Sequence, residues 1–461
     1  MNKKTIHILI IFAVITTNLF FGLPRLARYT AVDETLWSYD RVPKFWRSIE
    51  KGNWRGTNLC DKPGVTLAMV SGLGLPFIPD PRDYEKLQFQ SKTPEQLAMI
   101  EKIYFSLRLP VYLFTLASLF AFYFLLKRLL SDDIALLAVI FIGLSPILLG
   151  ISLIVNTDAI LWILMPLTLI SFLIYQKEDN RKFLYLAGVL LGLGILDKFV
   201  ANFLFPFLLA LVLLKYVLSD HAQTEDKVRF LKKSMVDYLI LIAIALVTIF
   251  IFYLGNSVSS IGSTVRYQIV NYPVAAIIAA IGLSGIAKFG PVKKYFLGIK
   301  FYLLVGFIFI ISIISLTQTK PFFLAYSSSL LPDRFMTNLK DMGDGSWETS
   351  HYLNSLPGAE RLVIWSDKKQ VCEKFVGRCK TGFRYKDLVN FKFDYLIVSA
   401  GGKAETLSRS SQRKSTFESA FGPINVEKLY APDGYSDFKV NIDDKLEDFI
   451  KVVNPATISN D

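Results

Sequence analysis

Two adjacent acids, Asp33 and Glu34, follow closely on the first long apolar run, within the segment "RYTAVDETLWSYDR" from Arg28 to Arg41. Paired carboxylates are suited either to proton abstraction or to the coordination of a cation. A solvated turn that happens to carry two acids is the plain alternative. The dipeptide alone does not decide between these interpretations, so the polar residues beside the other apolar runs are considered with it.

Cations stand at two further positions in the same half of the chain. Lys62, preceded by Asp61 in "LCDKPGVT", comes directly before a Pro-Gly turn. A lysine beside a rigid turn at a membrane surface is well placed to meet a lipid phosphate. Arg108, in "YFSLRLPVYLF", lies near the start of the second apolar run. Its guanidinium can donate two hydrogen bonds to one phosphate. The alternative is that the side chain snorkels to the membrane surface and has no function.

An acid and a lysine occur at the ends of later apolar runs. Asp158, in "LIVNTDAILW", begins the fourth run. An acid that enters the membrane is costly enough to be a functional candidate. The alternative is helix capping by the cluster of Asn156, Thr157 and Asp158. Lys198, in "LGILDKFVANF", is explained by an ion pair or by snorkelling.

These residues are positioned by a chain built mainly of apolar runs. Of the 461 residues, 52% are hydrophobic and only 20% are charged. About nine runs approach the ~20 residues that an α-helix needs to cross a hydrocarbon core of ~30 Å. We therefore predict a polytopic α-helical membrane protein. The expected spans are residues 6–23, 103–126, 134–150, 157–175, 183–196, 199–217, 237–254, 273–288 and 301–317.

The distribution of basic residues predicts the orientation of these spans. Lys and Arg gather in the segments 127–128, 176–182, 226–233 and 288–300, and the alternate loops have almost none. This is the positive-inside pattern, which places the basic segments and the N-terminus in the cytoplasm. It accounts for the net charge of +12 without nucleic acid as a partner. The N-terminal run is longer than a signal-peptide core and lacks a cleavage site, so we expect it to remain as the first span.

Two large pieces are then extracytoplasmic: the loop 24–102, which belongs to a transmembrane domain of residues 1–317, and the C-terminal domain 318–461. Aromatic and basic residues are interleaved between 41 and 54, which favours a helix lying at the membrane interface. The apolar segment 64–79 is short and rich in Gly and Pro. We expect it to be interfacial or re-entrant rather than a span.

The C-terminal region has the pattern of a small α/β domain. β-branched runs at 361–367 and 394–400 predict strands, and the segment 346–358 has helical spacing with a Pro-Gly stop. Cys372 and Cys379 either form a disulfide, if this region is outside the cytoplasm, or are two unremarkable thiols.

The order of these features resembles that of one group of membrane enzymes. A "DE" after the first span is followed by a "KPG" turn, an arginine opening the second span, a "TDA" opening the fourth, and the run "AGVLLGLGILDKF". Together they resemble the GT-C glycosyltransferases of the protein O-mannosyltransferase and aminoarabinose-transferase type (glycosyltransferase family 39/83-like). The resemblance covers roughly residues 1–220 and implies the GT-C fold.

The resemblance implies an inverting enzyme that moves a sugar from a polyprenyl-phosphate donor to an acceptor hydroxyl, on the extracytoplasmic side of a membrane of the bacterial inner-membrane type. The acceptor is a lipid, a glycan or a protein. The family's general base corresponds to Asp33, with Glu34 as a supporting acid. Lys62 and Arg108 would stabilise the lipid phosphate, and Asp158 would orient the acceptor or support the polar network around the base.

No cofactor follows from the resemblance, although a divalent cation is compatible with it. Glu34 and Asp61 are the candidate ligands. Asp61 stands where the aminoarabinose-transferase pattern has glutamate, which weakens the case for a metal there.

Two other functions compete with this one. A transporter or flippase of lipid-linked sugars needs inverted repeats or polar residues near the middle of the membrane. The polar candidates here lie instead at the expected outer surface. A polysaccharide polymerase is expected to carry its arginines in a later outer loop, where Arg266 stands alone.

Overall fold

The chain forms two compact units. A computed structural model describes residues 2–59, 63–218, 233, 235–244, 269–288, 299–326, 343–381, 391–399, 425, 428–429, 431, 434–440 and 450–458. The first unit comprises Met1–Gly22, Arg41–Gly74 and Leu107–Leu316, and the second comprises Leu23–Asp40, Leu75–Ser106 and Thr317–Asp461. The second unit therefore combines two pieces of the expected first outer loop with the C-terminal region.

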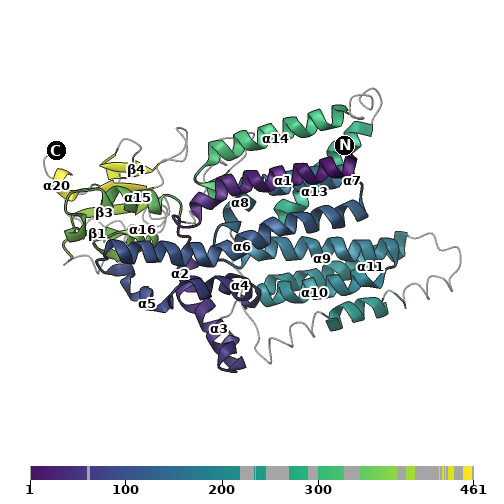
Figure 1. Cartoon of the computed structure of the whole chain (residues 1–461), viewed down its shortest axis with the longest axis horizontal. Helices are drawn as coiled ribbons and strands as arrows, with labels where there is room; N and C mark the ends of the chain where they lie inside the picture. Colours follow the sequence, from purple (N-terminus) through teal and green to yellow (C-terminus); the bar gives the residue numbers. More distant parts are fainter. Residues whose placement is uncertain are drawn as a thin grey trace. The chain divides into compact units, whose positions relative to one another are not determined.

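The first unit is a bundle of apolar helices (Figure 1). Within the described residues, five helices are long and apolar enough to cross a membrane, and α7 and α8 form a sixth candidate that is bent by 62°. The predicted polytopic helical architecture is confirmed, whereas the count of nine spans stays a prediction. Residues 245–254 of the seventh expected span lie outside the described residues. The helices are α1 (Lys3–Gly22), α3 (Val42–Glu50), α4 (Val65–Ser71), α6 (Pro94–Leu129), α7 (Asp132–Gly143), α8 (Pro146–Ser152), α9 (Asp158–Glu178), α10 (Arg181–Asp197), α11 (Leu204–Leu218), α13 (Asn271–Lys288) and α14 (Ile299–Thr319).

Short polar side chains set the starts of several of these helices. Ser131 accepts a hydrogen bond from the N–H of Ile134 at the start of α7, and Asn180 accepts one from Lys182 at the start of α10. Ser145 caps α8 and is followed by Pro146 in the first turn. Proline lacks an N–H and is favoured in the first turn of a helix, and the expected single span 134–150 divides into α7 and α8 at this point.

The bundle is held by close helix packing and presents apolar side chains outward. The absence of a side chain at Gly143 lets α7 approach α1, where Asn18 Nδ2 donates to the Gly143 carbonyl at 2.6 Å. Helices α9 and α10 lie side by side and share a buried core. On α14, Leu303, Phe307 and Ile310 are more than half exposed. An outward apolar face of this kind suits contact with lipid.

The second unit contains a five-stranded sheet in the order β2-β1-β3-β5-β4. β1 (Val363–Ser366) pairs in parallel with β2 (Arg378–Thr381) and β3 (Tyr395–Ser399). β5 (Ile450–Val453) runs antiparallel to β3 and to β4 (Phe438–Val440). The predicted strands at 361–367 and 394–400 are confirmed as β1 and β3.

Two helices of the second unit lie beside the sheet, α15 (Ser346–Asn354) and α16 (Lys369–Lys374) (Figure 1). α15 confirms the predicted helix, and α16 links β1 to β2 in a short parallel crossover. The pieces from the expected outer loop are largely irregular. Their elements are η1 (Leu23–Arg25), α2 (Glu34–Leu36), a π-helical turn η2 (Trp37–Arg41), α5 (Arg82–Glu85), η5 (Lys86–Phe89) and the first turns of α6.

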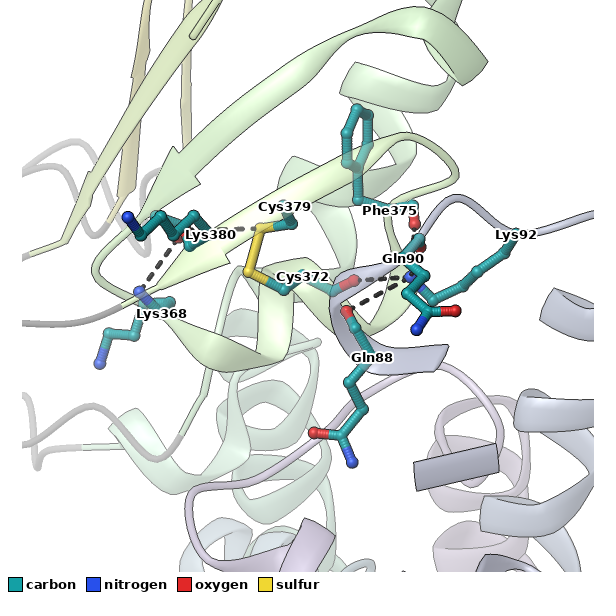
Figure 2. The surroundings of a disulfide bond; sticks show 9 residues. Gln88, Gln90, Lys92, Lys368, Cys372, Phe375, Cys379 and Lys380 are labelled. Atoms are coloured by element: carbon teal, nitrogen blue, oxygen red, sulfur yellow. Dashed lines mark hydrogen bonds between the residues drawn. A yellow bond between two sulfur atoms is a disulfide. The ribbon is translucent and has the colours of Figure 1, made fainter. Parts of the chain in front are cut away.

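A disulfide between Cys372 and Cys379 closes the α16–β2 connection, with Cα atoms 5.2 Å apart. Lys92 lies beside it and is almost fully buried (Figure 2). Its Nζ donates to the carbonyls of Gln90, Cys372 and Phe375, each at 3.0 Å. The lysine therefore joins the segment before α6 to the disulfide-closed turn.

Burial lowers the pKa of Lys92 from 10.5 to about 8, against the charge of Glu373, which raises it. The pKa is therefore lower in the folded chain than in the unfolded one. Between about pH 8 and pH 10 the unfolded chain binds more protons at this site, so the unfolding free energy rises with pH across that window and is flat below it.

We expect wild type to gain stability relative to Lys92→Met between pH 8 and pH 10, by up to about 1.4 kcal/mol per pH unit. The measurement is the unfolding midpoint of both purified proteins at each pH, because titrations common to both cancel in the difference. A difference that stays constant from pH 7 to pH 10 would contradict the lowered pKa.

Candidate functional site

Asp33 occupies an unusual backbone position in the second unit. Its φ of 67° and ψ of −10° place it in the left-handed region. Among the described non-glycine residues, only Asp179 also has a positive φ. Such positions cost about 1–3 kcal/mol and cluster at functional sites. Aspartate tolerates the conformation better than most residues. Asp33 is half-buried.

Glu34 differs from its neighbour because it is fully buried. Its Oε2 accepts a hydrogen bond from the N–H of Ala31 at 2.9 Å, and its own N–H donates to the Ala31 carbonyl at 3.2 Å. The side chain thus folds back onto the turn that carries Asp33. This geometry suits a residue that shapes the turn.

Asp158 forms a buried ion pair in the first unit. Its Oδ1 lies 2.6 Å from Lys198 Nζ, and the two side chains are only 2% and 8% exposed. The pair joins the start of α9 to the residue that follows α10. Asn156 also accepts a hydrogen bond from the Asp158 N–H, as the capping alternative predicts, whereas the N-cap residue Thr157 makes no side-chain capping bond. The carboxylate itself is engaged by Lys198.

Asp197, next to Lys198, fixes the start of α4. Its carbonyl accepts from the Gly64 N–H at 2.9 Å, and its Oδ1 accepts from the Leu67 N–H at 3.2 Å. Gly64 has a φ of 63°, a left-handed conformation that favours glycine. The Pro-Gly turn that follows Lys62 is therefore attached to the end of α10. Asp61 and Lys62 themselves lie outside the described residues.

Arg108 is fully buried in α6 of the first unit. A guanidinium away from water is costly unless its charge is compensated, so this depth fits a functional or network role better than simple snorkelling. Among the described residues, no group of three or more His, Cys, Asp or Glu side chains is arranged as a metal site.

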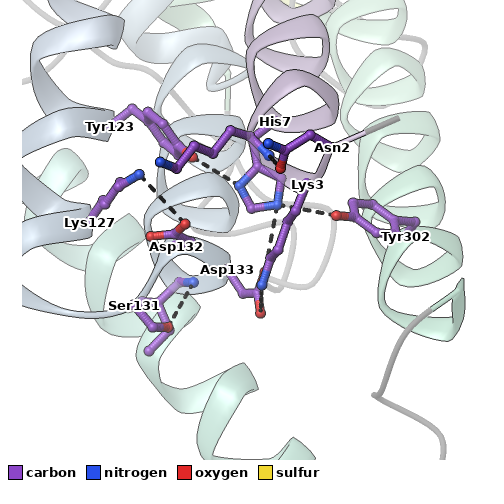
Figure 3. Close-up of polar contacts among 11 residues, drawn as sticks. Asn2, Lys3, His7, Tyr123, Lys127, Ser131, Asp132, Asp133 and Tyr302 are labelled. Carbon is purple, nitrogen blue, oxygen red and sulfur yellow. Dashed lines mark hydrogen bonds and ion pairs between the residues drawn. The ribbon is translucent and has the colours of Figure 1, made fainter.

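A separate polar cluster surrounds His7 in the first unit (Figure 3). His7 is fully buried, and its Nδ1 lies 2.9 Å from the Tyr123 hydroxyl. Its Nε2 lies 3.6 Å from Asp133, which also pairs with Lys3 at 2.9 Å. The Tyr302 hydroxyl is 3.4 Å from the same nitrogen. The cluster connects α1, α6, α7 and α14, and we interpret its role as structural.

The predicted site residues fall in both units. Asp33 and Glu34 belong to the second unit, and Arg108 and Asp158 to the first. The structure brings Asp158 together with Lys198, for which an ion pair was one of the two expected explanations. Convergence of all the predicted residues on one cavity stays a prediction. Asp197 was missed, although its place beside Lys198 at the end of an apolar run marks it as a polar residue that needs partners.

Residues 97–254 match the sequence profile of the family described as dolichyl-phosphate-mannose-protein mannosyltransferase. No curated protein matches the chain. Solved structures of the oligosaccharyltransferase of Archaeoglobus fulgidus match with low scores. The apo form has 14% identity and a TM-score of 0.40, covering 71% of this chain and 40% of its own. The form with zinc and sulfate has 13% identity and a TM-score of 0.38, covering 74% and 42%. The present chain therefore spans less than half the length of that enzyme.

The profile match supports the predicted resemblance to GT-C glycosyltransferases over residues 97–254, about a third of the chain. The apolar helices of the described residues suit a multi-pass membrane protein.

The buried ion pair predicts a characteristic pattern of stability losses. Lys198→Met leaves the Asp158 carboxylate buried without its partner and should cost about 3–5 kcal/mol. Asp158→Asn combined with Lys198→Met removes both charges and should cost clearly less than the single change. The measurement is unfolding of the purified, solubilised protein. Lys102→Met, at an exposed lysine, is the matched control and should behave like wild type. Equal losses in the single and double variants would contradict the pair.

Proposed function

We propose that the chain is a GT-C glycosyltransferase that transfers a sugar from a polyprenyl-phosphate donor to an acceptor hydroxyl, with inversion at the anomeric carbon and with Asp33 as the general base. The observation that carries the proposal is the backbone of Asp33, a half-buried non-glycine residue held in a left-handed turn. Strained positions of this kind persist only where the surrounding structure determines them.

The proposed reaction is a single displacement. The Asp33 carboxylate takes the proton from the acceptor hydroxyl as its oxygen forms a bond to the anomeric carbon. The bond from that carbon to the phosphate oxygen breaks, and its electron pair leaves with the polyprenyl phosphate. This leaving group is already ionised near neutral pH, so it needs charge stabilisation rather than a strong general acid.

In the proposed reaction Arg108 and Lys62 stabilise the negative charge of the leaving group. Arg108 is fully buried in α6, and Lys62 precedes the turn that Asp197 holds. Each is a candidate to bind the lipid phosphate. In this scheme Asp158 supports the polar network through Lys198, and the buried Glu34 supports the Asp33 turn. The acceptor is a lipid, a glycan or a protein.

We further propose that the first outer loop and the C-terminal region lie on the extracytoplasmic side of a membrane of the bacterial inner-membrane type. The disulfide between Cys372 and Cys379 supports this orientation, since disulfides persist in oxidising compartments and are rare in the cytosol.

The base assignment is tested by comparing cells that lack the protein with cells that produce wild type or Asp33→Asn. Glycolipids and glycoproteins are compared by mass spectrometry, and the product lost on deletion defines the reaction. We expect Asp33→Asn to lower that product by about a hundredfold or more, because a positioned general base contributes about 10²–10⁴. Asp40→Asn, at an exposed acid in the same segment, is the matched control and should restore the product fully. Near-normal product with Asp33→Asn would exclude Asp33 as the base.

The orientation is tested by trapping thiols in intact cells. Cells are quenched with an alkylating reagent, and the protein is digested without reduction. We expect a cross-linked peptide pair containing Cys372 and Cys379. Recovery of both residues as alkylated thiols would place the C-terminal region in a reducing compartment and contradict the orientation.

A further inference from the structure

The segment around Asp33 is held by the C-terminal region on both sides of the proposed base, all within the second unit. Before it, Arg25 pairs with Glu348 at 2.9 Å, and Lys374 Nζ donates to the Ala27 carbonyl at 3.2 Å. After it, the Tyr39 hydroxyl donates to Glu373. These contacts join residues that are more than three hundred positions apart in sequence.

Close backbone approach adds to these contacts. Gly343 has a φ of 101°, and a Cβ at this position would collide with the Thr30 carbonyl oxygen. The C-terminal region thus meets the backbone of the Asp33 segment directly at Thr30. Lys369 Nζ lies 3.5 Å from the Thr35 hydroxyl on the other side of Asp33.

Glu373 is the centre of the strongest of these contacts. It is fully buried, and its Oε1 accepts hydrogen bonds from Tyr39 at 2.6 Å and from Tyr104 at 2.7 Å. The two phenol rings meet edge to face, with centroids 6.0 Å apart. Short hydrogen bonds to a carboxylate are about twice as strong as neutral ones, and their loss leaves a buried charge without donors. Burial, followed by the charge of Glu373, raises the pKa of Tyr39, so this phenol stays protonated and able to donate.

The end of α16, which carries Glu373, is itself held by several partners. The disulfide of Cys372 brackets it on one side, and Lys92 donates to the carbonyls of Cys372 and Phe375, which flank Glu373 (Figure 2). Asn354 donates to the carbonyl of Lys374 and accepts from the N–H of Val376. A side chain whose backbone is fixed by so many partners can hold another residue to within a fraction of an ångström.

We propose that Glu373 is a positioning residue for the proposed base: through its hydrogen bond to Tyr39 it fixes the turn that presents the Asp33 carboxylate. The inference rests on the proposed function and deepens it, because it gives the C-terminal domain a part in the reaction. Misplacement of a catalytic group by about 1 Å costs of the order of a hundredfold in rate. In this role the domain acts on the chemistry by holding the segment that carries Asp33.

The geometry supplies a conservative variant. One oxygen, Oε1, accepts both phenol hydrogen bonds, so the amide oxygen of Glu373→Gln is able to accept both as well. Glu373→Ala removes the acceptor altogether. Tyr39→Phe removes only the hydrogen bond that leads to the Asp33 turn and keeps the ring. This series separates the positioning hydrogen bond from the packing of the domain.

The experiment produces each variant in cells that lack the native protein. Two quantities are measured: the amount of the product that deletion removes, and hydrogen exchange of residues 28–38 in the purified full-length protein. Tyr352→Phe makes the same chemical change at a tyrosine that stacks on Phe438 within the domain. Asp394→Asn changes a carboxylate that accepts from the Val363 N–H, at the start of β1. Both are matched controls.

We expect Glu373→Ala and Tyr39→Phe to lower the product by about tenfold or more and to raise exchange in residues 28–38. Glu373→Gln should retain at least half of the wild-type product, and both controls should match wild type. If Glu373→Ala does not accumulate, Tyr39→Phe decides the outcome.

Wild-type product from both Glu373→Ala and Tyr39→Phe would overturn the positioning role while leaving Asp33 as the base. Equal losses in the controls, or exchange that rises across the whole domain, would show general destabilisation and overturn it too. Near-normal product from Asp33→Asn would instead refute the base assignment, and Glu373 would then position no catalytic group.

Discussion

A charged side chain that is removed from water must be given partners, and this constraint organises both units of the chain. In the first unit Lys198 and Asp158 neutralise each other across the ends of α9 and α10. In the second unit Glu373 is held by two phenols, and Lys92 by backbone carbonyls. Apolar packing is non-directional and tolerates small shifts. The charged side chains and their partners, in contrast, cannot separate without leaving a buried charge unpaired. They therefore fix the register of segments that the apolar core alone would leave adjustable.

The same constraint separates the two adjacent acids that the sequence presents as equivalent. Glu34 is buried, and its carboxylate accepts a hydrogen bond from the N–H of Ala31. Asp33 is half-buried and carries the backbone strain of a left-handed turn. Glu34 stabilises the turn through its carboxylate, and Asp33 occupies the strained position within the turn. In the proposed reaction the residue on this strained turn is the general base, and proton transfer demands close and repeatable geometry.

Much of the fold follows from local sequence patterns. Apolar runs predict the helices of the first unit, and β-branched runs predict β1 and β3, because each pattern reflects the burial of nearby residues. The break between α7 and α8 was missed, although Pro146 marks it, because a continuous apolar run outweighed one proline. The role of Asp33 as a base was predicted from its order among other polar residues, and it stays a prediction. Glu373 was not predicted, since nothing near it in sequence reveals that its partners are Tyr39 and Tyr104.

That difference has a physical origin in the kind of segment that carries the proposed base. Between the end of α1 and the start of α3 the backbone forms short helical turns joined by irregular stretches. A strained residue in such a segment persists where the surrounding structure determines its geometry. Here the surrounding contacts come from a domain far along the chain, through Glu348, Glu373 and Lys374. The residues that perform the proposed chemistry and those that make it precise are thus encoded in different parts of the sequence, and only the folded chain relates them.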